Sequence, residues 1–354
     1  MNQPKRTNGK VSWRCPSNIA LVKYWGKHGE QLPNNPSLSI TLQNAFSETT
    51  VSYIFDEFQN DVVTSFSFGK ARNEAFEVRV NKFLNKIQPQ MPFLKHLKLS
   101  IESKNNFPHS AGIASSASSF GSLALCICSI EQQLFGQLSG YLEFKEKASY
   151  LGRIGSGSAC RSMYDGFVVW GKHPSIESSS EIYSVPLNHS IHPVFQKMQD
   201  SILIVSSEKK KVSSSEGHAL MEKNPYAPIR YANANLRLQQ LMVALEKGDM
   251  QQFIKITESE ALELHALMML SEASYILFRP NSLAIIEKVR KLRAETGLPV
   301  CFTLDAGPNV HLLYPESVKE EVQNFIREEL LPLCEHNQWI HDRIGQGPVQ
   351  LMNE

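Results

Sequence analysis

The sequence predicts an α+β protein of two domains, and three observations lead to this prediction. Its 354 residues exceed the roughly 100–200 residues of a single domain. Segments that alternate apolar and polar residues are interleaved with segments of helical spacing in both halves of the chain. Residues 173–190 hold two prolines and a serine cluster, a composition typical of a connection. We therefore predict domains at residues 1–190 and 191–354.

The first half is predicted to be a sheet covered by helices. Period-two alternation of apolar residues indicates strands at residues 37–42, 49–55, 62–68 and 97–101, and a short apolar run indicates another at 166–170. Apolar residues at helical spacing predict helices at residues 74–87 and 141–153. The stretch 115–134 is apolar and small almost all round, which predicts a buried central helix that is too short to span a membrane.

The second half is predicted to alternate strands with long amphipathic helices. The expected strands lie at residues 201–206, 299–304 and 310–314, and the expected helices at residues 229–246, 250–270, 282–295 and 316–330. Gly297 follows the third of these helices as a terminator. No period of about 20–50 residues recurs, so a solenoid or propeller is not expected.

Charge and composition exclude several classes of protein. The 36 Lys and Arg residues nearly balance the 35 Asp and Glu residues, so we expect no nucleic-acid or membrane-surface partner. No apolar run approaches the ~20 residues of a membrane span, and residues 1–10 lead into no signal-type apolar core, so we expect a cytoplasmic protein. The six cysteines and eleven histidines show no metal-ligand or disulfide spacing, which predicts reduced thiols and leaves any metal ligands unknown.

Residues 105–117, Asn-Asn-Phe-Pro-His-Ser-Ala-Gly-Ile-Ala-Ser-Ser-Ala, combine small residues with the start of the predicted central helix. The free N–H groups of a helix N-terminus bind anions, so this segment is a candidate phosphate site. Its spacing fits neither the P-loop nor the dinucleotide-binding glycine pattern. Tight helix packing would select the same small residues, so the pattern by itself leaves both interpretations open.

A second small-residue segment and an aspartate extend the candidate site. Gly155-Ser-Gly-Ser-Ala-Cys-Arg-Ser162 offers hydroxyls for phosphate, and the Arg161 guanidinium for a carboxylate, although a flexible turn with a surface arginine is the alternative. Asp305 directly follows an apolar strand and is placed to reach into a cleft. Because Asp305 precedes Ala-Gly-Pro, the pattern by itself favours an ordinary turn.

Lysines within apolar sequence form the last candidate. Lys23 and Lys27 lie among apolar and aromatic residues in the segment 17–27. Such a lysine serves an anionic ligand or, more commonly, extends its ammonium group to solvent. The run of three lysines at 209–211 is by default a solvated charged segment, and the serines that follow it make a border of a phosphate pocket the alternative.

Taken together, five segments resemble the diphosphomevalonate decarboxylases of the GHMP kinase superfamily. They occur in that family's order and span about 290 residues: Asn18–Lys27, Asn105–Pro108 with Ala111–Ala117, Gly155–Ser162, Val212–Ser214 and Asp305–Asn309. The tryptophan-containing first segment and the Ser-Ala-Cys-Arg segment are more specific than any glycine loop.

The resemblance implies both a fold and a reaction. The fold is a two-domain GHMP kinase-like α+β fold, with a ribosomal protein S5 domain 2-like N-terminal domain, a ferredoxin-like C-terminal domain and an active site in the cleft between them, often as a homodimer. The reaction is that of an ATP- and Mg²⁺-dependent carboxy-lyase of isoprenoid biosynthesis. Mevalonate 5-diphosphate is phosphorylated on its C3 hydroxyl and then loses phosphate and carbon dioxide to give isopentenyl diphosphate and ADP.

The resemblance also implies roles for individual residues. The catalytic set is Asp305 as the base for the C3 hydroxyl, Lys23 beside it, Arg161 on the substrate carboxylate, Asn18 supporting Arg161, and Ser116 on the transferred phosphate. The substrate-binding set is Tyr24, Trp25, Gly26, Lys27, Arg72, Ser156, Gly157, Ser158, Ala159, Cys160, Ser214 and Ser215. The nucleotide-binding set is Asn106, Pro108, Ser110, Ala111, Gly112, Ile113, Ala114, Ser115 and Ser116.

Some residues depart from the family's pattern. Pro36 stands where many relatives have serine, His109-Ser110 replaces Thr-Ala, and Ser215 is threonine or arginine elsewhere. These departures leave three alternatives beside the main interpretation: a phosphomevalonate decarboxylase, a mevalonate-type 3-kinase and a non-catalytic metabolite-binding paralogue. The joint presence of Asp305, Lys23 and Arg161 favours a decarboxylase over a pure kinase.

Overall fold

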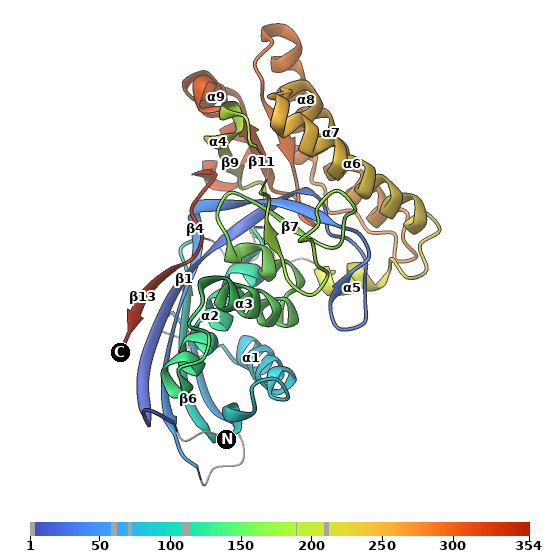
Figure 1. The fold of residues 1–354 in the computed structure, drawn as a ribbon. Helices are drawn as coiled ribbons and strands as arrows, with labels where there is room; N and C mark the ends of the chain where they lie inside the picture. Colours follow the sequence, from blue (N-terminus) through green and yellow to red (C-terminus); the bar gives the residue numbers. More distant parts are fainter. Residues whose placement is uncertain (1–3, 58–61, 70–72, 108–112, 189, 209–211) are drawn as a thin grey trace.

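The computed structural model describes residues 4–57, 62–69, 73–107, 113–188, 190–208 and 212–354. It confirms the predicted α+β class: two main sheets lie in the two halves of the chain, each covered by helices (Figure 1). No helix of these residues is long and apolar enough to cross a membrane. All six cysteines are free, buried thiols.

The first sheet forms the lower part of the molecule in Figure 1 and has the strand order β13-β1-β4-β6-β5, with β7 and β8 attached through β4. Its described strands are β1 (Asn8–Val22), β4 (Ser37–Phe55), β5 (Val63–Phe68), β6 (Leu97–Asn105), β7 (Phe167–Trp170), β8 (Val185–Pro186) and β13 (Val349–Asn353). The helices α1 (Glu74–Ile87), α2 (Ser115–Phe135) and α3 (Tyr141–Gly155) bury their apolar residues in one core with β1, β4 and β6.

Two features of the first sheet differ from the prediction. The expected strands at 37–42 and 49–55 are one 19-residue strand, β4, whose start pairs with β7 and whose end pairs with β6. The 15-residue strand β1 was not predicted, because the alternation over residues 11–15 is short and ends at Pro16, and the run from Ile19 to Val22 is apolar throughout. Beside β1 lies the small hairpin β2 (Lys27–His28) and β3 (Leu32–Pro33).

The second sheet has the antiparallel order β10-β11-β9-β12. Its strands are β9 (Gln199–Leu203), β10 (Cys301–Thr303), β11 (Val310–Tyr314) and β12 (Trp339–Arg343). The helices of this half are α4 (Pro193–Gln196), α5 (Ser214–Ala219), α6 (Ala227–Lys247), α7 (Met250–Met269), α8 (Pro280–Thr296) and α9 (Lys319–Phe325). The predicted helix at 316–330 is interrupted: α9 lies between a 3₁₀ turn at Glu316–Val318 and a π turn at Ile326–Leu330.

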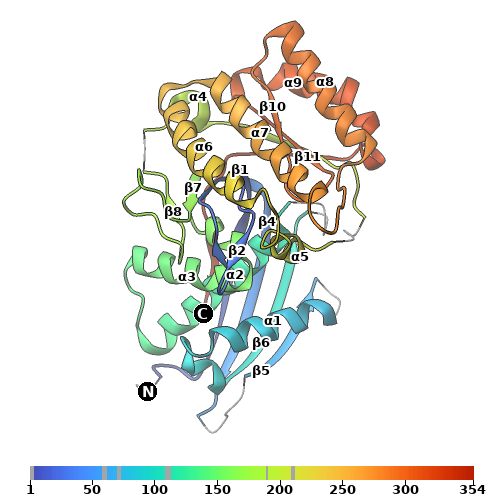
Figure 2. The same cartoon turned by 90° about the vertical axis from the view of Figure 1, so that its right-hand side faces the viewer.

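The two halves share a core and a strand. Ile19 and Leu38 of the first half pack in the same buried cluster as Ile202 and Leu238 of the second. The strand β13, from the end of the chain, pairs antiparallel with β1 at the edge of the first sheet (Figure 1), and Figure 2 shows α6 and α7 of the second half above that sheet. Residues 349–353, predicted within the second domain, therefore belong to the first sheet. Further short 3₁₀ helices lie at Pro92–His96, Gly157–Met163, Leu331–Leu333 and Glu335–Asn337.

Candidate active site

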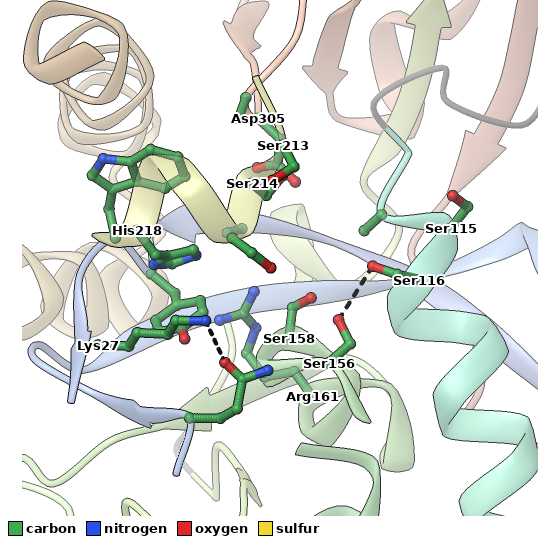
Figure 3. A pocket seen from close by; sticks show the side chains of 18 of the residues that line it. Lys27, Ser115, Ser116, Ser156, Ser158, Arg161, Ser213, Ser214, His218 and Asp305 are labelled. Carbon is green, nitrogen blue, oxygen red and sulfur yellow. Dashed lines mark hydrogen bonds between the residues drawn. The ribbon is translucent and has the colours of Figure 1, made fainter. Parts of the chain in front are cut away.

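A cavity of about 580 Å³ lies between the two halves, and Figure 3 shows polar side chains of both halves facing it. It brings together predicted residues that are far apart in the sequence. Fourteen of them line it: Lys23, Tyr24, Trp25, Lys27, Ala114, Ser115, Ser116, Ser156, Gly157, Ser158, Arg161, Ser214, Ser215 and Asp305.

An ion pair between Lys23 and Asp305 lies in the cavity wall. Lys23 directly follows β1, Asp305 comes two residues after β10, and the Lys23 Nζ donates to Asp305 Oδ1 over 2.9 Å. The Lys23 side chain is 1% exposed, whereas that of Asp305 is 28% exposed and remains accessible to a ligand. Burial by itself would raise the pKa of Asp305, but the Lys23 ammonium and other nearby positive charges, Arg161 among them, together lower it. Asp305 is thus an ionised carboxylate in the cavity.

A buried charge network fixes the backbone of Lys23. Glu260 on α7 accepts from the Lys23 N–H over 2.8 Å, and Arg230 on α6 donates to the Lys23 carbonyl over 2.8 Å. Arg230 also donates to both carboxylate oxygens of Glu260 over 2.7 Å, and Arg237 adds a bond of 2.8 Å. The sequence analysis missed these residues, because charges on amphipathic helices are usually solvated. The seven-residue spacing of Arg230 and Arg237 on one helix was the available signal.

The Asp305 backbone is also held in place. The Nε2 of His265 on α7 donates to the Asp305 carbonyl over 3.1 Å, and its ring stacks on Phe278 with centroids 4.0 Å apart. Because α7 contacts both Lys23, through Glu260, and Asp305, through His265, this single helix sets the relative position of the two charged residues.

Arg161 is a buried cation that is held by neutral side chains. It lies in the 3₁₀ helix after α3 and is 3% exposed. Its guanidinium donates to Ser37 Oγ over 2.6 Å and to Asn18 Oδ1 over 3.4 Å, while Asn18 is itself oriented by Ser162. No carboxylate of the described residues forms an ion pair with it. Since a buried charge needs a counter-charge, this geometry indicates an anionic ligand.

The start of α2 and the end of α3 meet on one side of the cavity. Ser116 Oγ and Ser156 Oγ lie 3.2 Å apart and can hydrogen bond. α2 begins at Ser115, as predicted, after Ala114 in a left-handed conformation with φ of +45°, and no side chain caps it. The first N–H groups of a helix without a cap remain available as donors to an anion.

The opposite side of the cavity carries Lys27, Tyr24 and α5. The Lys27 Nζ donates to Gln31 Oε1 over 2.7 Å, and burial lowers the pKa of Lys27, as does nearby Lys86. The Tyr24 hydroxyl is buried and has no hydrogen-bond partner among the described residues. His218, which the sequence analysis left without a role, also lines this side.

Other predicted residues lie outside the cavity lining. Asn18 lies behind Arg161, which fits its predicted supporting position. Gly26, with φ of +95°, turns the chain after Trp25. Asn106 is exposed and bonds instead to the backbone of Phe46 and Asn44 of β4. Buried packing positions are taken by Ile113, Ala159 and Cys160. Five further predicted site residues lie outside the described part of the chain: Arg72, Pro108, Ser110, Ala111 and Gly112.

Metal-binding side chains are scarce. Among the residues that the structure describes, no group of three or more His, Cys, Asp or Glu side chains could hold a metal ion. Asp305 is the one carboxylate of the described cavity lining. Oxygen donors such as Ser115 and Ser116 remain for any ion that arrives with a nucleotide.

Comparisons with known proteins identify the family of the chain. The model of the diphosphomevalonate decarboxylase-like N-terminal domain matches residues 15–182, and that of the mevalonate 5-diphosphate decarboxylase C-terminal domain matches residues 201–351. The diphosphomevalonate decarboxylase of Aspergillus fumigatus is 30% identical over 93% of this chain and 83% of its own.

Solved structures show the same fold. The structure of MDDEF in complex with MVAPP, AMPPCP and magnesium is 30% identical, with a TM-score of 0.81 over 97% of this chain and 98% of its own. The crystal structure of mevalonate diphosphate decarboxylase from Staphylococcus aureus is 29% identical, with a TM-score of 0.81 over 98% of both chains. Because both family models match and a relative is 30% identical over 93% of this chain, the chain belongs to the diphosphomevalonate decarboxylase family.

Proposed function

We propose that this protein converts mevalonate 5-diphosphate and ATP into isopentenyl diphosphate, ADP, phosphate and carbon dioxide, as a step of isoprenoid biosynthesis by the mevalonate pathway. The observation that carries the proposal is the buried Arg161, which forms no ion pair with any described acidic residue and lies in the same cavity as the Lys23–Asp305 pair. A kinase needs only a base for the substrate hydroxyl. A decarboxylase also needs a cation that holds the substrate carboxylate, and Arg161 is such a cation. The cavity lining includes the carboxylate of Asp305 and the guanidinium of Arg161, which supports a decarboxylase.

Asp305 serves the first chemical step. A tertiary hydroxyl is a very weak acid, so the carboxylate orients it and takes its proton as the phosphoryl group is transferred from ATP. Because its pKa is lowered by Lys23, Asp305 is ionised at neutral pH and ready to accept. Lys23 lies within 2.9 Å of the same carboxylate and stabilises negative charge on the C3 oxygen and the transferred phosphate.

Arg161 serves the second step. It holds the C1 carboxylate while the bond between C3 and the phosphate oxygen breaks and phosphate leaves. The electron pair of the C1–C2 bond then forms the C2=C3 double bond, and C1 leaves as carbon dioxide. The positive character of C3 receives these electrons, so the protein needs no electron-accepting cofactor. Asn18 and Ser37 keep the guanidinium in place.

The remaining polar residues suit the phosphate groups. Tyr24, with its unpartnered hydroxyl, and Lys27 lie with Ser156, Ser158, Ser214 and Ser215 in the cavity, where they bind the diphosphate of the substrate. The start of α2, with Ser115 and Ser116, binds the phosphates of ATP. The hydroxyls of these two serines fit Mg²⁺, which takes most of its ligands from phosphate and water and, when bound, neutralises phosphate charge.

Product analysis tests the proposal. The protein is incubated with ATP, Mg²⁺ and either mevalonate 5-phosphate or mevalonate 5-diphosphate, and ADP and carbon dioxide are followed together. Equal release of both with the diphosphate is expected. ADP without carbon dioxide would identify a 3-kinase, neither product would identify a binding paralogue, and faster turnover of the monophosphate would identify a phosphomevalonate decarboxylase.

We further propose that the protein acts as a cytoplasmic homodimer. The buried, free thiols suit a reducing compartment, and the family resemblance implies the dimer. On α6, Ile229, Leu236 and Val243 are exposed at seven-residue intervals, a spacing that supports contact with the helix of a second copy. Light scattering coupled to size-exclusion chromatography measures the mass: about twice 39.9 kDa supports the dimer, and a single-chain mass contradicts it.

A further inference from the structure

His218 is a buried histidine of the cavity wall for which neither the reaction nor the sequence motifs provide a role. It lies in α5, and its ring is packed against two aromatic rings, with centroid distances of 4.2 Å to Tyr24 and 4.6 Å to Trp25. The side chain is nearly fully buried, at 8% exposure, and lines the cavity. Its position is therefore fixed by packing before any ligand binds.

One ring nitrogen of His218 is committed to the backbone. The Gly26 N–H donates to Nδ1 of His218 over 3.0 Å, so Nδ1 must be the unprotonated, accepting nitrogen. Burial, together with the positive charges of Lys27 and Arg161, lowers the pKa of His218 to about 3. A neutral imidazole that accepts at Nδ1 carries its proton on Nε2.

The other nitrogen is a free donor. Nε2 has no hydrogen-bond partner among the described residues. It is also not fully buried, so a ligand in the cavity can reach it. In Figure 3, His218 lies on the side of Lys27 and opposite Ser115 and Ser116 at the start of α2. A group that meets Nε2 therefore belongs to the substrate's end of the cavity and not to the nucleotide phosphates.

We propose that His218 binds the substrate by donating a hydrogen bond from Nε2–H to an oxygen of the phosphate group that Lys27 also contacts. This inference rests on the proposed function and names a specificity residue for it. Lys27 and Arg161 already supply positive charge, and a neutral donor adds a direction to phosphate recognition without adding a third cation next to them. The positive charges of Lys27 and Arg161 also disfavour protonation of the His218 ring, so His218 remains a neutral donor across the physiological pH range.

Two substitutions separate the donor from the packing role. His218→Asn places an amide oxygen near the position of Nδ1, where it can accept from Gly26, but removes the donor at Nε2. His218→Gln is longer and carries an amide N–H toward the position of Nε2. We expect the Kd for mevalonate 5-diphosphate, measured by calorimetry without nucleotide, to rise roughly tenfold in the Asn variant and to return to within about threefold of wild type in the Gln variant.

The control is His192→Asn. His192 also accepts a backbone N–H at Nδ1, from Val194, but it lies away from the cavity lining, and its Asn variant is expected to keep the wild-type Kd. Equal Kd values for wild type and His218→Asn, or no binding of the substrate to wild type, would overturn the inference. A Kd raised equally in the Asn and Gln variants, with lower melting temperatures, would overturn it in favour of a packing role.

The choice of ligand resolves which phosphate is contacted. A tenfold loss with both mevalonate 5-phosphate and the diphosphate supports a bond to the phosphate next to C5, and a loss with the diphosphate alone supports a bond to the terminal phosphate. Carbon dioxide release by the wild type is measured separately. Binding that depends on His218 without any release would refute the proposed reaction while leaving the phosphate contact supported.

Discussion

Two buried cations face the cavity with different support from the protein. Lys23 lies against Asp305 and is fixed by Glu260 and Arg230, whereas the described hydrogen bonds of the Arg161 guanidinium go to neutral oxygens of Ser37 and Asn18. Burying a charge without a counter-charge costs several kcal/mol. An anionic ligand that pairs with Arg161 removes this cost, and the pairing therefore contributes much of the ligand's binding free energy. Lys23 and Arg161 are both cations, but their different hydrogen-bond partners suit them to different roles in the cavity.

The Asp305→Asn variant tests the role of the base. It keeps the size of the side chain but cannot accept the hydroxyl proton, so carbon dioxide release is expected to fall by roughly 10²–10⁴-fold or to background. Affinity for a non-hydrolysable ATP analogue, measured by calorimetry, is expected to stay near the wild-type value. Asp249→Asn is the control, because asparagine caps α7 as well as aspartate does. Near-normal carbon dioxide release by Asp305→Asn would refute the assignment.

Glu260→Gln tests the network behind Lys23. The substitution leaves buried Arg230 without its main counter-charge, since Glu263 remains only at 3.2 Å, so the free energy of unfolding is expected to fall by about 3 kcal/mol. Urea denaturation measures this change. The control Glu295→Gln removes an exposed pair with Lys291 and is expected to cost less than about 0.5 kcal/mol. Equal effects of the two variants would show that the network does not hold the site.

At the scale of elements, the shortest helix near the cavity depends on close packing. α5 has six residues, yet it carries Ser214, Ser215 and His218 into the cavity wall. A Cβ on Gly217 would lie 2.5 Å from the Trp25 ring and 2.7 Å from the Tyr275 hydroxyl. Only glycine therefore lets α5 approach this closely, and the helix was missed in the sequence because six residues show no periodicity.

Gly217→Ala is expected to push α5 away from Trp25. The overpacking should lower the free energy of unfolding by about 1–3 kcal/mol, and the displaced α5 should raise the KM for the substrate. Gly140→Ala is the control, since its Cβ would meet only Glu143 at 3.8 Å and it lies far from the cavity lining. Urea denaturation and initial rates of carbon dioxide release measure both effects. A wild-type KM in a destabilised Gly217→Ala variant would show that α5 does not position the site.

At the scale of the whole molecule, the site exists only because the two halves are held together. Lys23 and Asp305 are 282 positions apart in the sequence, and neither half alone forms their ion pair. Asp342 of β12 reinforces the junction by accepting N–H groups of Gln43, Asn44 and Ala45 in the middle of β4. The junction thus includes a buried carboxylate.

The pH dependence of stability follows from this carboxylate. Burial raises the pKa of Asp342 to about 6, although the N–H groups of Asn44 and Ala45 lower it. The folded state therefore binds more protons than the unfolded state between pH ~4 and ~6, and this group's contribution to stability falls as pH rises through that window, by up to about 3 kcal/mol. Unfolding free energies from pH 4 to 7 are expected to fall more steeply in wild type than in Asp342→Asn; parallel curves would contradict the shift.

The sequence by itself determined the α+β class, most helices, the start of α2 at Ser115 and, through five motifs, the family. These features depend on local spacing and on short contiguous segments. It did not reveal β1, in which Pro16 interrupts the alternation of apolar and polar residues, or α5, which is too short to show a helical period. The bounds of the two domains at residue 190 remain a prediction, with β13 in the first sheet.

Only the tertiary structure decided which polar residues meet and in what state. Whether Asp305 is a turn residue or a cavity acid depends on Lys23, and whether Arg161 lies at the surface or is buried depends on how α3 ends against β1 and β4. No sequence motif pointed to His218, which lines the cavity because α5 packs against Tyr24 and Trp25. Charge pairing and burial arise from contacts between distant segments, and for that reason they are absent from any local pattern in the chain.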